Sequence, residues 1–160
     1  MNCQYMSKTS NVLLTLLAVF IVIQFFRPEK NQSSAATPDD LFAHYPATDS
    51  LKQLIKSSCY DCHSNNTKYP WYAQVQPVAW WLDDHVKAGQ RKFNFSEFAT
   101  YPAKKADHKM EEFIEMVKEE EMPLPSYTLL HTNAELTTGQ RIALTKWAAE
   151  IRKEIQPNTK

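Results

Sequence analysis

Glycine is almost absent from this chain, which has only two in 160 residues, Gly89 and Gly139. Tight two-residue hairpins depend on glycine, so a sheet built on such turns is disfavoured. Leu, Lys, Glu and Ala, which favour helices, are plentiful instead. The folded part of the sequence also shows no alternation of apolar and polar residues and no internal repeat. These features predict an all-α fold.

An excess of charge is absent as well. Eighteen Lys and Arg balance eighteen Asp and Glu. Nucleic-acid-binding domains usually carry a basic excess, so we expect no nucleic-acid partner. Cysteine is scarce, with three residues in all. Cys3 precedes the apolar N-terminal run, so it cannot be the lipid-bearing cysteine that follows a lipoprotein signal, and we interpret it as an incidental thiol.

The one long hydrophobic run covers residues 12–26 and is interrupted only by Thr15 and Gln24. It is long for a cleavable signal core and shorter than the roughly 18 to 20 residues that span a bilayer comfortably. No cleavage site of small residues follows directly, and the nearest candidate is residues 33–36. We expect residues 1–27 to be an uncleaved anchor in the cytoplasmic membrane, with the domain on the periplasmic side. Cleavage to a soluble periplasmic domain is the alternative.

The rest of the chain divides into a linker over residues 28–46 and a helical domain over residues 47–157. The linker is rich in small polar residues, has no apolar periodicity and is typical of a tether. In the domain, Met110 belongs to an apolar stripe, and Thr137 with Gln140 forms a capping box before an apolar face that includes Ile142. Apolar spacing predicts a helix just before Cys59, with Thr48, Asp49 or Ser50 as its N-cap, and a last helix from Thr137. It also predicts a helix over residues 77–88 that is capped by Gly89 and one over residues 104–121.

Residues 59–63 read Cys-Tyr-Asp-Cys-His, the C-x-x-C-H pattern of covalent haem attachment. Two thiols one helical turn apart, Cys59 and Cys62, can each add to a haem vinyl group, and His63 then ligates the iron. The pattern is expected in roughly one of 600 shuffled sequences of this composition. Chance is therefore a poor explanation.

Two other sites use similar residues. A thioredoxin-like dithiol shares C-x-x-C, but it is sought beside a βαβ pattern, and here a predicted helix precedes the pair. A zinc site needs a fourth ligand, and no second C-x-x-C or paired-His cluster offers one. An export signal favours haem, because two exported cysteines would otherwise oxidise.

The motif extends into a longer resemblance. It is carried by the nine residues 59–67, by Pro70-Trp71-Tyr72, Pro77-Val78, Trp80-Trp81, His85-Val86 and Gly89, and by Asn94-Phe95-Ser96. Over about residues 41–155 the chain resembles the bacterial haem-binding domain family, small monohaem c-type cytochromes with an N-terminal hydrophobic segment. The family usually has an aromatic residue such as Trp near this part of the sequence, so Phe98 is a mild departure from the family pattern. The resemblance implies one covalently attached haem c in a small cytochrome c-like helical domain, and electron transfer with redox partner proteins that it does not identify.

The second axial ligand is predicted to be Met122. Pro123 forces the chain out of a helix directly after it, which leaves the thioether on an irregular segment that can approach an open haem face. A Met-Pro before the last helix is also a feature of the family. The other candidates are Met110, Met116, His85, His108 and His131, of which His85 leads the histidines.

These residues together predict an electron carrier rather than an enzyme. The alternative is a haem sensor or a peroxidase-like enzyme with an open sixth iron position. The sequence also suggests that Pro70 or Pro77 supplies a carbonyl for the Nδ1 proton of His63. Four tryptophans are candidates to enclose the porphyrin: Trp71, Trp80, Trp81 and Trp147.

Overall fold

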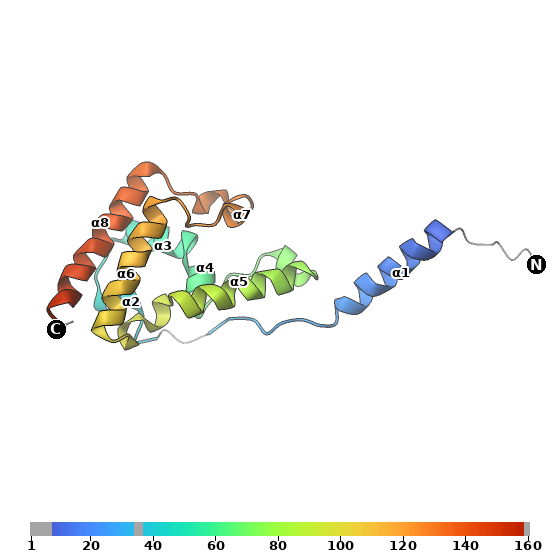
Figure 1. Cartoon of the computed structure of the whole chain (residues 1–160), viewed down its shortest axis with the longest axis horizontal. Coiled ribbons are helices and arrows are strands. Elements are labelled where there is room, and N and C mark those ends of the chain that lie inside the picture. Colours follow the sequence, from blue (N-terminus) through green and yellow to red (C-terminus); the bar gives the residue numbers. More distant parts are fainter. Residues whose placement is uncertain (1–7, 34–36, 159–160) are drawn as a thin grey trace, which may run out of the picture. The chain divides into compact units, whose positions relative to one another are not determined.

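The computed structural model describes residues 8–33 and 37–158, and in this part of the chain the regular structure is entirely helical. The only extended pairing there is an isolated bridge between Gln32 and Asn66. The predicted all-α fold is confirmed. Cys3, and residues 34–36 of the candidate cleavage site, lie outside the described residues. The α-helices are α1 (Lys8–Ile23), α2 (Leu41–His44), α3 (Asp49–Ser58), α4 (Tyr60–His63), α5 (Val78–Lys92), α6 (Ala103–Lys118), α7 (Pro125–Thr128) and α8 (Thr138–Ile155), and short 3₁₀ turns occupy Trp71–Gln74, Phe95–Thr100, Thr132–Ala134 and Gln156–Asn158 (Figure 1).

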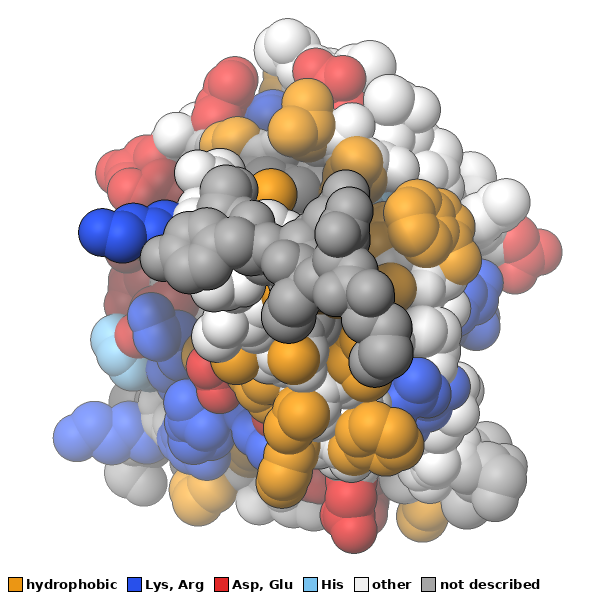
Figure 2. All heavy atoms as spheres, turned by 90° about the vertical axis from the view of Figure 1, so that its right-hand side faces the viewer, with side chains coloured by type: hydrophobic (Ala, Val, Ile, Leu, Met, Phe, Trp, Pro, Cys, Tyr) orange, Lys and Arg blue, Asp and Glu red, His pale blue; other side chains and the backbone are white. Residues whose placement is uncertain are grey.

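The chain divides into two units, one made of residues up to 30 with residues 69–85, the other of residues 31–68 with residues 86–160. In the first unit, most of the apolar N-terminal run forms α1, whose large apolar side chains are exposed. Hydrophobic side chains stand uncovered on the face shown in Figure 2. No helix in the described part of the chain combines the length and the apolarity needed to cross a membrane.

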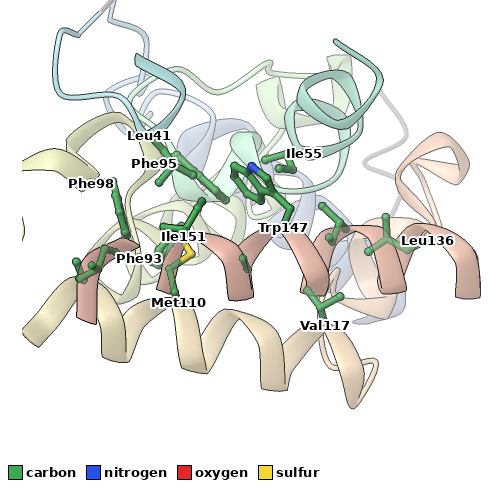
Figure 3. Packing of buried hydrophobic residues seen from close by; sticks show 14 residues of the cluster. Leu41, Ile55, Phe93, Phe95, Phe98, Met110, Val117, Leu136, Trp147 and Ile151 are labelled. Atoms are coloured by element: carbon green, nitrogen blue, oxygen red, sulfur yellow. The ribbon is translucent and has the colours of Figure 1, made fainter. Parts of the chain in front are cut away.

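The core of the second unit forms where α6 and α8 pack side by side. Met110 on α6 and Leu144 on α8 are fully buried. Trp147 packs in the same cluster, and its indole N–H donates to the Pro46 carbonyl at 3.2 Å. Met110 is therefore a core residue, as its position in the apolar stripe predicts. The buried cluster comprises Leu41, Ile55, Phe93, Phe95, Phe98, Ala106, Met110, Val117, Leu136, Leu144, Trp147, Ala148, Ile151 and Ile155 (Figure 3).

The predicted caps of two helices are confirmed. Thr48 accepts a hydrogen bond from the Leu51 amide at the start of α3. Thr137 and Gln140 form the capping box of α8. On α8, however, Ile142 is 62% exposed, so the prediction that it lies on the apolar face is wrong.

Two predicted helix ends are also wrong. The helix α6 ends at Lys118 rather than at residue 121, and Glu120 then takes φ 61°, a left-handed conformation that ends the helix. The helix α5 continues past Gly89 to Lys92, so Gly89 is an interior residue and not a cap. The reason for a glycine at this position is a contact described below.

Residues 28–46 do more than tether. Leu41 in α2 is fully buried in the core, and Asp40 caps this helix by accepting from the Phe42 amide at 2.9 Å. Residues 31–33 pair with residues 65–67. This segment is held by hydrogen bonds and one deeply buried side chain. Such contacts produce no apolar periodicity, which is why the sequence resembles a linker.

Candidate functional site

The C-x-x-C-H motif occupies a single turn of helix. The helix α3 ends at Ser58, Cys59 follows it, and α4 spans Tyr60–His63. The amides of Cys62 and His63 both donate to the Cys59 carbonyl, at 3.3 and 3.0 Å. This turn places Cys59 and Cys62 on one side of the helix. Both cysteines are half-buried free thiols.

The imidazole of His63 is held by the backbone of α5 and the residue that follows it. Its Nδ1 lies 2.9 Å from the Phe93 carbonyl. A carbonyl only accepts, so Nδ1 carries the proton and Nε2 is the nitrogen with a lone pair for a metal. The acceptor is Phe93, not Pro70 or Pro77 as the sequence suggested. Phe93 itself is 8% exposed and packs in the core, so the imidazole is oriented by a residue of the buried cluster.

Burial lowers the pKa of His63 and outweighs the carbonyls of Phe93 and Gly89, which act in the opposite direction. The imidazole is therefore neutral at neutral pH, the form that binds iron. Burial, and secondly Cys62, raises the pKa of Cys59 to about 12. Burial, and secondly Asp61, raises the pKa of Cys62 to about 11. Reactive dithiols show the opposite shift, so these thiols do not resemble those of a thioredoxin-like protein.

Gly89 lets α5 approach the motif closely. A Cβ built on Gly89 would lie 2.4 Å from the Cys62 carbonyl oxygen and 3.2 Å from the Cys62 Cβ. The nearest atoms include backbone, so they cannot turn aside as a flexible side chain would. The scarcity of glycine in this chain was the signal that could have marked the position.

We expect Gly89→Ala to destabilise the domain by about 1 to 3 kcal/mol, because the added methyl must push α5 away from the motif. The measurement is thermal unfolding of the haem-loaded protein. The matched control is Gly139→Ala in α8, where an added Cβ has nothing within 4 Å. That variant should gain up to about 1 kcal/mol from better helix propensity. Equal melting temperatures for the two variants would contradict the contact.

The two middle residues of the motif anchor it on different sides. The Tyr60 ring stacks between Phe42 and Phe95, with centroids at 5.8 and 5.0 Å, and its hydroxyl donates to Asp40 at 2.9 Å. Burial, with Asp40 second, raises the pKa of Tyr60, which therefore stays a donor. Asp61 accepts from the Tyr127 hydroxyl at 2.7 Å.

The residues after the motif form a polar network. Ser64 is fully buried, and its hydroxyl donates to the Tyr60 carbonyl at 2.8 Å. Thr67 is 2% exposed and donates to the Asp61 carbonyl at 2.6 Å. The Asn65 side-chain oxygen accepts from Asn94 at 2.7 Å. This network explains why the motif extends past His63: its polar residues fix the loop to α4 and to the residues after α5.

Met122 lies on the irregular segment predicted for it. Its amide donates to the Met116 carbonyl at 3.1 Å, its carbonyl accepts from Arg141 at 3.3 Å, and its side chain is half-buried. The hydrogen bond that joins this segment to the motif is made by Tyr127 on α7, which sequence reasoning missed. Iron ligation by Met122 stays a prediction.

The three histidines considered as alternative iron ligands make contacts with neighbouring side chains or backbone. His85, in the first unit, packs on the Trp81 ring at 4.2 Å, and its Nδ1 lies 2.8 Å from the Trp81 carbonyl. His108 is exposed beside Glu111 and Glu112. His131 stacks on the Tyr127 ring at 4.1 Å.

The tryptophans predicted to enclose the cofactor fall into both units. Trp147 belongs to the core of the second unit. In the first unit, Trp71 is 80% exposed, Trp81 is exposed, and the Trp80 indole N–H donates to the Phe26 carbonyl at 2.8 Å. Enclosure of a porphyrin by these four residues stays a prediction.

In the described part of the chain, no three His, Cys, Asp or Glu side chains converge on a site that could hold a metal ion. A neutral imidazole with its Nδ1 fixed, one residue from a pair of free thiols on the same helical turn, fits a haem group. The fold and the site thus define the class as an all-helical haem-binding protein.

The comparison with family models supports this assignment to the haem-binding proteins. The model described as the haem-binding domain matches residues 18–150, and the chain belongs to this family. No curated protein and no solved structure matched the chain.

Proposed function

We propose that this protein is a monohaem c-type cytochrome that transfers electrons outside the cytoplasmic membrane. In this proposal Cys59 and Cys62 hold the haem through thioether bonds, and His63 and Met122 are the axial ligands. The observation that carries it is the hydrogen bond from His63 Nδ1 to the Phe93 carbonyl, at 2.9 Å, within one turn of two free thiols. Bound haem supplies the Fe(III)/Fe(II) couple.

The chain's own residues serve this role by orientation. The Phe93 carbonyl fixes the tautomer of His63 and makes the imidazole a better donor. Gly89 allows the α5 backbone to support the turn that carries both thiols. Asp61 and Tyr127 join the motif to the segment after Met122.

An uncovered apolar surface near the same segment supports the proposal. Leu129 and Leu130 are 79% and 63% exposed, directly after α7, whose Tyr127 bonds to the motif. A porphyrin is a large apolar surface, and covering these leucines with it would be favourable. They are therefore candidates for the wall of the haem pocket.

The direct test is an absorption spectrum of the oxidised and reduced protein, expressed with haem-maturation machinery. We expect a thioether-substituted haem that is low-spin in both oxidation states, since His63 and Met122 leave no open position. Carbon monoxide or cyanide should bind poorly at neutral pH. Strong binding of either without unfolding would point instead to the sensor or peroxidase-like alternative.

The proposed location is the periplasmic side of the cytoplasmic membrane, with residues 12–26 as the anchor and unidentified redox proteins as partners. The supporting observation is α1, whose large apolar side chains, from Val12 to Val22, are exposed in the first unit. Fractionation of cells tests this, because an anchored protein stays with membranes after a high-salt wash.

A further inference from the structure

Residues 31–33 lie along the polar loop that follows His63. The Thr67 amide donates to the Asn31 carbonyl at 2.9 Å, and the Ser33 amide donates to the Asn65 carbonyl at 2.8 Å. Between these bonds, Gln32 and Asn66 form the antiparallel bridge. We call residues 31–33 the strap. All of these contacts lie within the second unit.

The Asn31 side chain adds three hydrogen bonds. Its Nδ2 donates to the Ser64 carbonyl at 2.8 Å and to the Thr67 hydroxyl at 2.9 Å. Its Oδ1 accepts from Nε2 of the Gln90 side chain at 3.0 Å. The Ser64 carbonyl can only accept, so it fixes which end of the Asn31 amide faces the loop. Asn31 therefore uses both ends of its side chain, which no charged isostere can copy.

These bonds act on the residue next to the iron ligand. Ser64 follows His63 directly and is fully buried. Gln90, which contacts both Asn31 and the Ser64 carbonyl, lies on α5 one residue from Gly89. Asn31 thus links the loop after His63 to the helix that supports the motif. Losing its donor would leave the Ser64 carbonyl and the Thr67 hydroxyl each with one partner fewer.

The residues before the strap are also held, within the first unit. The Gln24 side chain accepts from the Gln76 amide at 2.9 Å, and the Phe26 carbonyl accepts from the Gln76 side chain at 2.8 Å. Gln76 is 1% exposed. Independently, the match to the haem-binding domain begins at residue 18. Residues 18–33 thus lie within the matched family domain.

We propose that Asn31 is a positioning residue of the haem-attachment motif, so that the mature protein keeps its N-terminal segment at least from residue 31. This inference rests on the proposed haem function of the motif. It follows that cleavage at residues 34–36 would remove the strap from the site it supports. Of the two processing alternatives, the uncleaved one is compatible with the motif loop.

The first test compares three variants of the full chain by thermal unfolding of the haem-loaded protein. Asn31→Asp replaces the donating nitrogen by a carboxylate oxygen facing the Ser64 carbonyl, and it should lower the melting temperature by about 5 to 10 °C at neutral pH. Asn31→Ala should lower it by less, since it removes the bonds without adding repulsion. The matched control is Gln32→Glu, which adds the same charge on the next residue, which is exposed. This variant should shift the melting temperature by no more than about 2 °C.

A pH profile separates positioning from a general loss of packing. The Asn31→Asp carboxyl, placed against a carbonyl, should have a folded pKa above its unfolded one. Its protonated form has one O–H, which can again donate to the Ser64 carbonyl while the other oxygen accepts from the Gln90 side chain, but nothing then donates to the Thr67 hydroxyl. This variant should therefore regain part of the lost stability as the pH falls through the folded pKa. The deficit of Asn31→Ala should not change. Subtracting the wild-type profile removes the contributions of Asp61 and Glu97, the carboxylates of the same loop network.

The second test is the mass of the mature, haem-loaded protein. The expected N-terminus lies at or before Asn31. A haem-loaded protein that begins at residues 35–37, or an Asn31→Asp variant that melts like wild type at neutral pH, would overturn the proposal. If the wild type carries no haem, the proposed function fails instead, and the same variants measured on the haem-free chain still decide whether the strap supports the motif.

Discussion

Replacing Cys59 and Cys62 together with alanine is expected to abolish haem retention on a denaturing gel. The motif cysteines lie one turn apart on the same helix, and they are the thiols in the described part of the chain. Noncovalent contacts, including those of His63, do not survive denaturation. Each single variant should keep at most one thioether bond, and so a reduced haem signal.

The matched control for this experiment is Cys3→Ala. Cys3 is the third cysteine of the chain and precedes the apolar run. Its replacement should leave the haem signal unchanged. Haem that still migrates with the double variant would contradict covalent attachment through Cys59 and Cys62, whatever the family membership.

Replacing Met122 with alanine is expected to convert the ferric haem from low-spin to high-spin or water-bound. A thioether ligand favours Fe(II) over Fe(III), so its loss should also lower the reduction potential and let cyanide or carbon monoxide bind. The segment suits this role because α6 ends at Lys118 and the chain turns at Glu120 before Met122. Absorption spectroscopy and a redox titration measure both effects.

Two further variants make the Met122 experiment specific. Met122→His should restore a low-spin spectrum while the potential stays low. Met110→Ala removes a fully buried methionine from the core and should cost about 2 to 5 kcal/mol of stability without changing the spectrum. If Met122→Ala keeps the wild-type spectrum and potential, another residue is the ligand, and His85→Ala is the next variant to make.

Features that depend on neighbours in the sequence were predicted well. The capping box of Thr137 and Gln140, the cap at Thr48 and the core position of Met110 follow from residue type and helical spacing, and the structure has all three. The C-x-x-C-H pattern likewise specifies its own geometry, because one helical turn relates its two cysteines. The family match supports the haem assignment made from this pattern.

Features that depend on contacts between distant residues were not predicted. Gly89 looked like a helix cap, yet its reason is the Cys62 carbonyl, 27 positions away in the sequence. The acceptor for His63 is a backbone carbonyl, that of Phe93, and any residue type could supply one. The strap residue Asn31 lay in a polar segment that has no periodicity to mark it as structured. In each case the deciding atom belongs to the backbone or to a small polar side chain, which hydrophobic patterns do not detect.

The two positions that the C-x-x-C-H pattern leaves open are not interchangeable in this chain. Adjacent residues on a helix point about 100° apart, so Tyr60 faces the aromatic core while Asp61 faces α7. Exchanging them would keep the C-x-x-C-H pattern but place a carboxylate between Phe42 and Phe95, and would remove the carboxylate that accepts from the Tyr127 hydroxyl at 2.7 Å. A graft of this pentapeptide onto another helical scaffold must therefore also supply the surroundings of its two middle residues. These are an aromatic pocket on one side of the turn and a hydroxyl donor on the other.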